Sequence, residues 1–166
     1  MISIKRFCKK HGACIDGIEW ALKNCKDMNE VWETAKPKWL IWVATRKGVL
    51  TDKELWLFAI WCARNVKQFM TDGRCIKIIE VSEMYVNVAE TDEELSAVWE
   101  SVWGAWRCFL RNNMPSSACE SAWNAANGAV SESANAACGD ADKGAARLSA
   151  RRNQADYLRK NCKPRF

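Results

Sequence analysis

The sequence predicts an all-α fold: a single-domain helical bundle with a tryptophan-rich core and an alanine-rich C-terminal helical hairpin. Ten tryptophans occur up to Trp123 and none follows it, whereas 13 alanines lie between Ala118 and Cys162. Helix-start motifs also recur along the first two-thirds of the chain. Large indole side chains fill the space between helices, while alanines allow helix backbones to approach closely.

The length of the chain is compatible with one domain. A chain of 166 residues buries roughly 70% of its unfolded surface when it folds. We therefore expect one all-helical domain over 1–166, with tryptophan-rich core helices in 1–114 and the alanine-rich hairpin with a basic tail in 115–166.

Three capping-box motifs mark helix starts. In this motif the first side chain accepts a hydrogen bond from a free backbone N–H, and a glutamate three residues later bonds back to the start of the helix. Each motif precedes an apolar segment with helical spacing, and the three pairs are Asp27/Glu30, Thr51/Glu54 and Thr91/Glu94.

Core helices are expected from these motifs and from apolar spacing. Pro37 suits the first turn of a helix that Gly48 ends. The segment 55–69 is apolar on nearly all sides at its start, so we expect a central, buried helix. The segment 95–110 places three tryptophans on one stripe, at Trp99, Trp103 and Trp106.

The segment 75–89 has two interpretations. Its β-branched residues favour a strand, but Ile78, Val81 and Met84 follow helical spacing. Because no convincing partner strand occurs elsewhere, we predict a helix.

The C-terminal hairpin follows from length. Pro115, Ser116 and Ser117 precede a segment, 118–162, that would measure about 67 Å as one straight helix at 1.5 Å per residue. A compact domain of this size has a radius of gyration of only about 15 Å. We therefore predict a reversal at Cys138–Asp140, with a ridge of small residues formed by Ala118, Ala122, Ala126, Ala129, Ser133 and Ala137.

Composition limits the location and the redox state. The longest apolar run, Leu55–Ala63, has nine residues, well short of the ~20 that span a bilayer. The first six residues lack the apolar region of a signal peptide. The nine cysteines form an odd number without a Cys-x-x-Cys pair, which favours reduced core thiols. We expect a cytoplasmic protein.

Charge is distributed unevenly along the chain. The net charge is +5, but 1–26 carries +4 and 143–166 carries +7, so the middle carries −6. Two basic ends could contact the acidic middle of the chain or present a basic patch to an acidic partner.

Catalytic and metal-binding patterns are weak. Cys8, His11 and Cys14 could supply three zinc ligands, with Cys25 as a fourth, but the spacing matches no common zinc pattern. A Cys–His nucleophile pair lacks an orienting third group and an oxyanion-hole loop. The acidic clusters resemble N-terminal helix turns. We therefore predict no catalytic residue, no metal and no cofactor.

The basic tail and one tryptophan are the best candidates for binding. Arg147 and Arg151 share a helix face because they are four residues apart. Arginine and tryptophan also dominate binding hot spots, and Trp20 is a second possible exposed anchor. The predicted partner-binding residues are Arg147, Arg151, Arg152, Arg159 and Trp123.

The order of hydrophobic landmarks resembles a predicted bacterial immunity-protein family, the fifth of the series named from polymorphic toxin systems, with relatives in phages and prophages. The alanine-rich helices resemble the C-terminal half of that family, and the landmarks are Ala13-Cys14-x-x-Gly17-x-x-Trp20-Ala21, Val31-Trp32, Trp39–Ala44 and Ala63-Arg64. The resemblance implies an all-helical protective protein that acts by binding, and it transfers no functional residue.

The sequence therefore predicts a non-enzymatic inhibitor that occludes the working surface of a toxin or of a bacterial defence protein. The alternative is a nucleic-acid-binding protein that uses its basic N- and C-terminal segments. We expect no membrane partner, and the sequence leaves the oligomeric state open.

Overall fold

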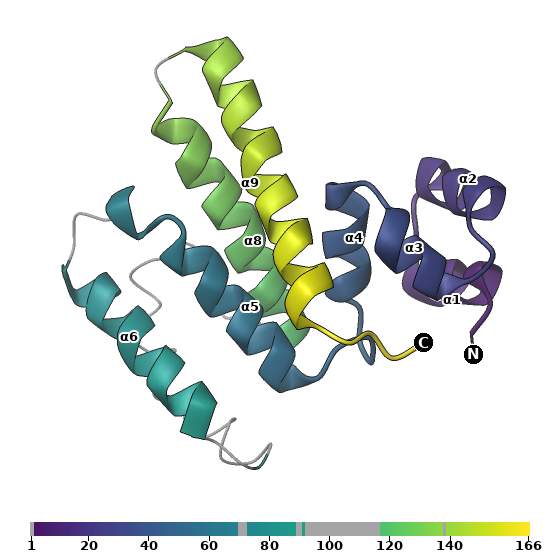
Figure 1. Ribbon diagram of the computed structural model, residues 1–166, viewed down its shortest axis with the longest axis horizontal. Coiled ribbons are helices and arrows are strands. Elements are labelled where there is room, and N and C mark those ends of the chain that lie inside the picture. Colours follow the sequence, from purple (N-terminus) through teal and green to yellow (C-terminus); the bar gives the residue numbers. More distant parts are fainter. Residues whose placement is uncertain (1, 70–72, 89–90, 92–116, 138) are drawn as a thin grey trace. The chain divides into compact units, whose positions relative to one another are not determined.

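The computed structural model describes residues 2–69, 73–88, 91, 117–137 and 139–166. These ranges fold into helices with short connections, and no strand occurs within them (Figure 1). The predicted all-α class is confirmed. The third capping-box pair and the expected helix 95–110, with its three tryptophans, lie outside the described residues except for the exposed Thr91.

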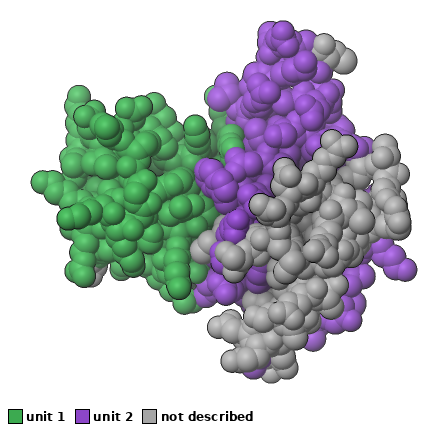
Figure 2. All heavy atoms as spheres, turned by 180° about the vertical axis from the view of Figure 1, so that it is seen from behind, with its two compact units in different colours: residues 1–50, 151–166 green, residues 51–150 purple. Residues whose placement is uncertain are grey.

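The chain divides into two compact units, which Figure 2 shows in different colours. Unit 1 combines 1–50 with 151–166, and unit 2 comprises 51–150. The helix α9 (Asp140–Asn161) contributes its first part to unit 2 and its remainder to unit 1.

Unit 1 begins with short helices joined by tight turns. Besides the end of α9, its described residues form α1 (Ile4–His11), α2 (Ile15–Asn24), α3 (Met28–Thr34) and α4 (Pro37–Ala44). The core of this unit contains the largest fully buried side chain, Trp32, together with Leu40, Ile41 and Leu158.

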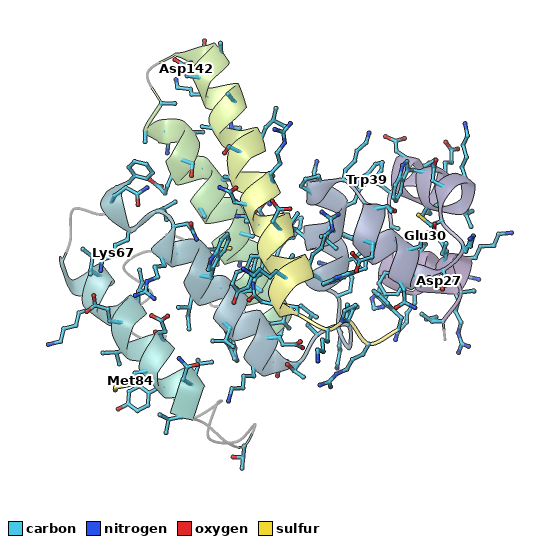
Figure 3. All side chains as sticks on the ribbon, in the orientation of Figure 1. Asp27, Glu30, Trp39, Lys67, Met84 and Asp142 are labelled. Atoms are coloured by element: carbon cyan, nitrogen blue, oxygen red, sulfur yellow. The ribbon has the colours of Figure 1, made fainter. Side chains whose placement is uncertain are left out.

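The first predicted capping box has a variant geometry. Asp27 caps α3 by accepting from the Glu30 N–H at 2.9 Å, and both side chains lie at the start of this helix in Figure 3. The Glu30 carboxylate accepts from the backbone N–H of Lys26 at 2.6 Å, one residue before the cap. The motif therefore starts the helix as predicted, but the returning hydrogen bond reaches further back.

The helix α4 starts as predicted and ends early. Pro37 is its first residue, where the missing N–H costs no hydrogen bond. The helix stops at Ala44 and not at Gly48, which instead takes a φ of 85° in the following turn. The Trp42 carbonyl in the last turn accepts from Arg46 Nε at 3.0 Å and from the Thr45 hydroxyl at 3.2 Å, so side chains satisfy it where the helix ends.

Unit 2 contains longer helices. These are α5 (Asp52–Arg64), α6 (Gly73–Val88) and α8 (Ala118–Asn135), with a 3₁₀ turn η1 (Lys67–Phe69) between the first two. The helix predicted for 55–69 is thus divided into α5 and η1. The segment with two interpretations is helical, because it falls within α6.

The helix α5 lies at the centre of unit 2, where it packs against α6 and α8. It starts with a complete capping box: Thr51 Oγ1 accepts from the Glu54 N–H at 3.1 Å, and Glu54 Oε2 accepts from the Thr51 N–H at 2.8 Å. Leu55 and Phe58 are fully buried. The predicted central helix is therefore confirmed, with its start set by Thr51.

The predicted small-residue ridge lies on α8 except for Ala137, which follows the end of the helix, and its first four alanines are buried. Ser117 caps the helix by accepting from the Glu120 N–H at 3.2 Å. The helix ends at Asn135, four residues before Gly139, and α9 then starts at Asp140. Figure 1 shows α8 and α9 running in opposite directions from this connection, as the hairpin prediction requires.

Candidate partner-binding surface

Most of the charge of the two basic ends belongs to unit 1, which contains all of 1–26 and six of the eight Lys/Arg residues of 143–166. This unit holds 16 Lys/Arg against six Asp/Glu, a formal charge of +10, in 66 residues. Unit 2 holds nine Lys/Arg against 14 Asp/Glu, a formal charge of −5. The fold thus collects positive charge in one unit, which electrostatically favours an anionic partner.

A single arginine anchors the C-terminal segment to α3. Arg159 donates from Nε to the Trp32 carbonyl at 3.2 Å and from Nη2 to the Ala35 carbonyl at 2.7 Å. These carbonyls lie at the end of α3, where the helix leaves its own acceptors unpaired. The backbone N–H of Arg165 also donates to the Val49 carbonyl at 2.8 Å. Positive charge at a helix C-terminus is favourable as well.

Aromatic rings hold the last residue. Phe166 meets Phe7 edge-on at a centroid distance of 5.9 Å and Trp32 at 6.3 Å. Phe7 also meets Trp42 edge-on at 6.3 Å, and the Arg46 guanidinium lies 5.0 Å from the Trp42 ring. Such edge-to-face pairs add to the stability gained from burial alone.

The predicted contact residues are divided between the two units. Arg147 and Trp123 belong to unit 2, and the other three belong to unit 1. Arg152 and Arg147 are exposed, whereas Trp123 is half-buried on α8. Arg151 is half-buried and donates to Gln154 Oε1 at 3.3 Å. Because Arg159 donates to carbonyls within its own unit, it has fewer donors left for a partner.

The tryptophan Trp20 also has a neighbour inside unit 1. It is half-buried on α2, and its ring lies 5.4 Å from that of Trp39 on α4. The Lys36 ammonium lies 5.1 Å from the Trp39 ring, which Figure 3 labels. This arrangement packs Trp20 against another helix, so an anchor role would use only its exposed edge.

A regular basic surface that was not predicted from the sequence lies on α1. Its cations are all exposed, while Ile4, Phe7 and Cys8 on the opposite side are buried. We call this surface the α1 cationic face, and it consists of Lys5, Arg6, Lys9 and Lys10. The signal was available, because two pairs of cations are spaced four residues apart beside an apolar face.

A second missed feature is an exposed apolar stripe on α2. Ile15 is 73% exposed and Leu22 is 43% exposed, and the half-buried Ile18 lies between them. The three residues follow the i, i+3, i+7 spacing of one helix face. We call them the α2 apolar stripe.

The weak zinc and nucleophile patterns gain no geometric support. In the described ranges, His, Cys, Asp and Glu side chains form no group of three or more suited to a metal ion. Burial, and then the nearby Cys14, raise the pKa of the Cys8 thiol, whereas a nucleophilic cysteine needs a lowered pKa. Burial, followed by the positive charges of Lys10 and Arg46, lowers the pKa of His11.

Comparison with known proteins adds no homologue. The sequence matches no family model, no curated protein and no solved structure. In the described part of the chain, no helix has the length and hydropathy needed to cross a bilayer. The immunity-family resemblance therefore stays a prediction.

Proposed function

We propose that this chain is a non-enzymatic, cytoplasmic inhibitor that binds an acidic surface on another protein and blocks that protein's working site. The partner would be a toxin or a bacterial defence protein, as the immunity-family resemblance implies. The observation that carries the proposal is the concentration of charge in unit 1, at +10 over 66 residues.

The construction of unit 1 suits binding by a preformed surface. Its C-terminal segment is joined to the N-terminal helices by Arg159, by the backbone of Arg165 and by the ring of Phe166. A surface held in its bound shape loses less conformational entropy on association. Complementary charge adds mainly to the rate of association and to selectivity.

Nucleic-acid binding is the second candidate, since 1–26 and most of the basic C-terminal segment, the two regions that this alternative requires, share unit 1. Phosphate contacts would come from exposed lysines and arginines, and the affinity would fall steeply with salt. Fluorescence anisotropy with single-stranded and duplex DNA would test this candidate. Loss of binding at about 0.15 M salt would exclude it, because specific complexes persist there.

The test of the inhibitor proposal is a purification of the full chain from the cells that make it, after nuclease treatment of the lysate. We expect one protein to be retained at a fixed stoichiometry and to lose its own activity when one equivalent of the chain is added. Retention of no protein, or of a protein whose activity is unchanged, would contradict inhibition.

A further inference from the structure

The α1 cationic face consists of four exposed cations on one short helix. Among the residues that the structure describes, none of its four side chains takes part in an ion pair or a hydrogen bond. The helix also contains no acidic residue. Four like charges within eight residues repel one another, so an external anion would relieve an unfavourable arrangement.

The placement of these charges is fixed by the opposite side of the helix. Ile4, Phe7 and Cys8 are buried, with exposed fractions between 3% and 7%. Ser3 caps the start, and Gly12, with a φ of 67°, ends the helix. A rotation of α1 that hid the cations would expose Phe7 and break its ring contact with Phe166. The cations are therefore held toward solvent.

The α2 apolar stripe follows closely along the chain. Ile15 comes five residues after Lys10, which limits their Cα separation to about 18 Å even in a fully extended chain. Exposed apolar side chains in a row are a common mark of a protein-binding site. Charged groups around an apolar centre are the usual composition of such a site.

The neighbouring carboxylates distinguish between the possible anionic partners. Asp16 and Glu19 are both exposed on α2, among the residues of the stripe. A duplex carries one negative charge per ≈ 1.7 Å, so a phosphate chain extending past α1 would approach these carboxylates. A protein surface can place its acidic groups opposite α1 alone and present apolar groups to α2.

We propose that the α1 cationic face and the α2 apolar stripe together bind a protein surface that bears carboxylates beside apolar side chains. This inference rests on the proposed inhibitor function and names the surface that performs it. It moves the principal contact from the arginines of α9 to the first two helices of unit 1.

The first experiment is carbodiimide cross-linking of the full chain to the protein that it retains. This reagent joins a lysine amine directly to a partner carboxylate in contact with it. We expect intermolecular cross-links at Lys5, Lys9 and Lys10. Cross-links confined to Lys143 and Lys160 on α9 would overturn the surface assignment and leave the inhibitor proposal intact, whereas absence of any complex would overturn both.

The second experiment uses charge reversal with a matched control. Changing the four cations of the α1 cationic face to glutamate should weaken binding by about tenfold or more, with the largest effect at low salt. The control changes four other exposed lysines of unit 1 to glutamate and so has the same net charge as the first variant. It should weaken binding by less than about threefold. These lysines are Lys23, Lys26, Lys38 and Lys47. Equal losses in the two variants would show that only net charge matters and would overturn the inference.

The apolar stripe and the class of partner need separate measurements. Ile15→Ser with Leu22→Ser should raise the dissociation rate and leave the salt dependence unchanged. Circular dichroism of every variant checks that the helices remain. Binding to a DNA duplex and to anionic phosphatidylserine vesicles is measured as well. The assignment to a protein partner would be overturned if the chain bound either of these more tightly than the retained protein and if the four α1 reversals abolished that binding.

Discussion

The internal contacts that stabilise unit 1 differ from those that stabilise unit 2. Unit 2 is built around α5, whose buried apolar side chains pack against the long helices α6 and α8. Unit 1 combines two distant parts of the chain through an arginine, a backbone hydrogen bond and a ring cluster. The comparison shows that apolar burial can build a compact unit from one continuous stretch of the chain, whereas joining the two chain ends also uses specific polar contacts.

The charge of the two units differs as much as their construction. Unit 1 is strongly basic and unit 2 is acidic. In unit 2, two cations pair with α6: the exposed Arg64 meets Glu83 at 2.6 Å, and the half-buried Lys67, labelled in Figure 3, meets Glu80 at 3.0 Å. The cations of α1 have no such partner among the described residues. These two cations are therefore paired within unit 2, whereas the four on α1 form no ion pair with the residues that the structure describes.

The largest expected effect is on the apolar core of unit 2. Phe58→Ala removes a fully buried ring at the centre of α5. We expect it to lower the free energy of unfolding by about 3–5 kcal/mol, because the lost burial and the cavity add together. Urea unfolding followed by circular dichroism measures this. The control Leu148→Ala, at a site that is 61% exposed, should change stability by less than about 0.5 kcal/mol.

The next effect tests the polar junction in unit 1. Arg159→Met keeps much of the side-chain volume and removes both hydrogen bonds to the carbonyls of Trp32 and Ala35. We expect a loss of about 1.5–3 kcal/mol in the free energy of unfolding, the range for hydrogen bonds to a charged group.

The exposed Arg152→Met serves as the matched control for this junction. If both substitutions cost the same, Arg159 would not be the anchor of the C-terminal segment, and the contrast between the units would disappear. Hydrogen exchange at the backbone amides of 162–166 gives a local readout, which only the first substitution should accelerate.

A smaller effect is expected at the start of α5. Thr51→Ala removes the oxygen that accepts from the Glu54 N–H and should cost about 1 kcal/mol. Thr51→Ser keeps that oxygen and should be close to the natural protein. If the serine variant lost as much stability as the alanine variant, the methyl group and not the cap would be responsible.

The smallest effect concerns pH and unit 1. Because the pKa of His11 is lowered in the folded chain from its ordinary value of 6.5, the unfolded chain binds the proton more readily. The contribution of neutral His11 to the stability of the folded chain is therefore present above pH 6.5 and declines as the pH falls toward the pKa of the folded chain. The free energy of unfolding, measured at a series of pH values from about 7.5 to 5, tests this decline on both sides of the ordinary histidine pKa. His11→Gln should flatten the curve in this range; an unchanged curve would assign the dependence to another group.

Local signals made much of the fold predictable. The caps at Asp27 and Thr51 act through hydrogen bonds within three residues, so the sequence carries them directly. Pro37 starts α4 for the same local reason. Helix ends were less predictable: α4 and α8 both stop four residues before the glycine that was expected to end them, because a helix can end wherever its last carbonyls find other donors.

The candidate site was less accessible to sequence reasoning. Arg159 was predicted to contact a partner, yet its acceptors lie 127 and 124 residues earlier in the chain. No local pattern distinguishes such an arginine from the exposed Arg152. Of the seven tryptophans in the described ranges, only Trp32 and Trp56 are buried, and the others are half-buried. Helical spacing places a ring on a face, but the neighbouring helices determine how much of it is covered.

The amino-acid sequence by itself determined the all-α class, most helix starts and the excess of positive charge at both ends, because caps, periodicity and composition act locally. Only the tertiary structure decided that most of the charge of those two ends shares one unit, that Arg159 bonds inward and that the exposed cations of α1 have no ion-pair partner among the described residues. The physical reason is that long-range contacts depend on which apolar faces meet when the chain folds. The spacing of apolar residues in the sequence indicates where those faces are but not which of them pack together.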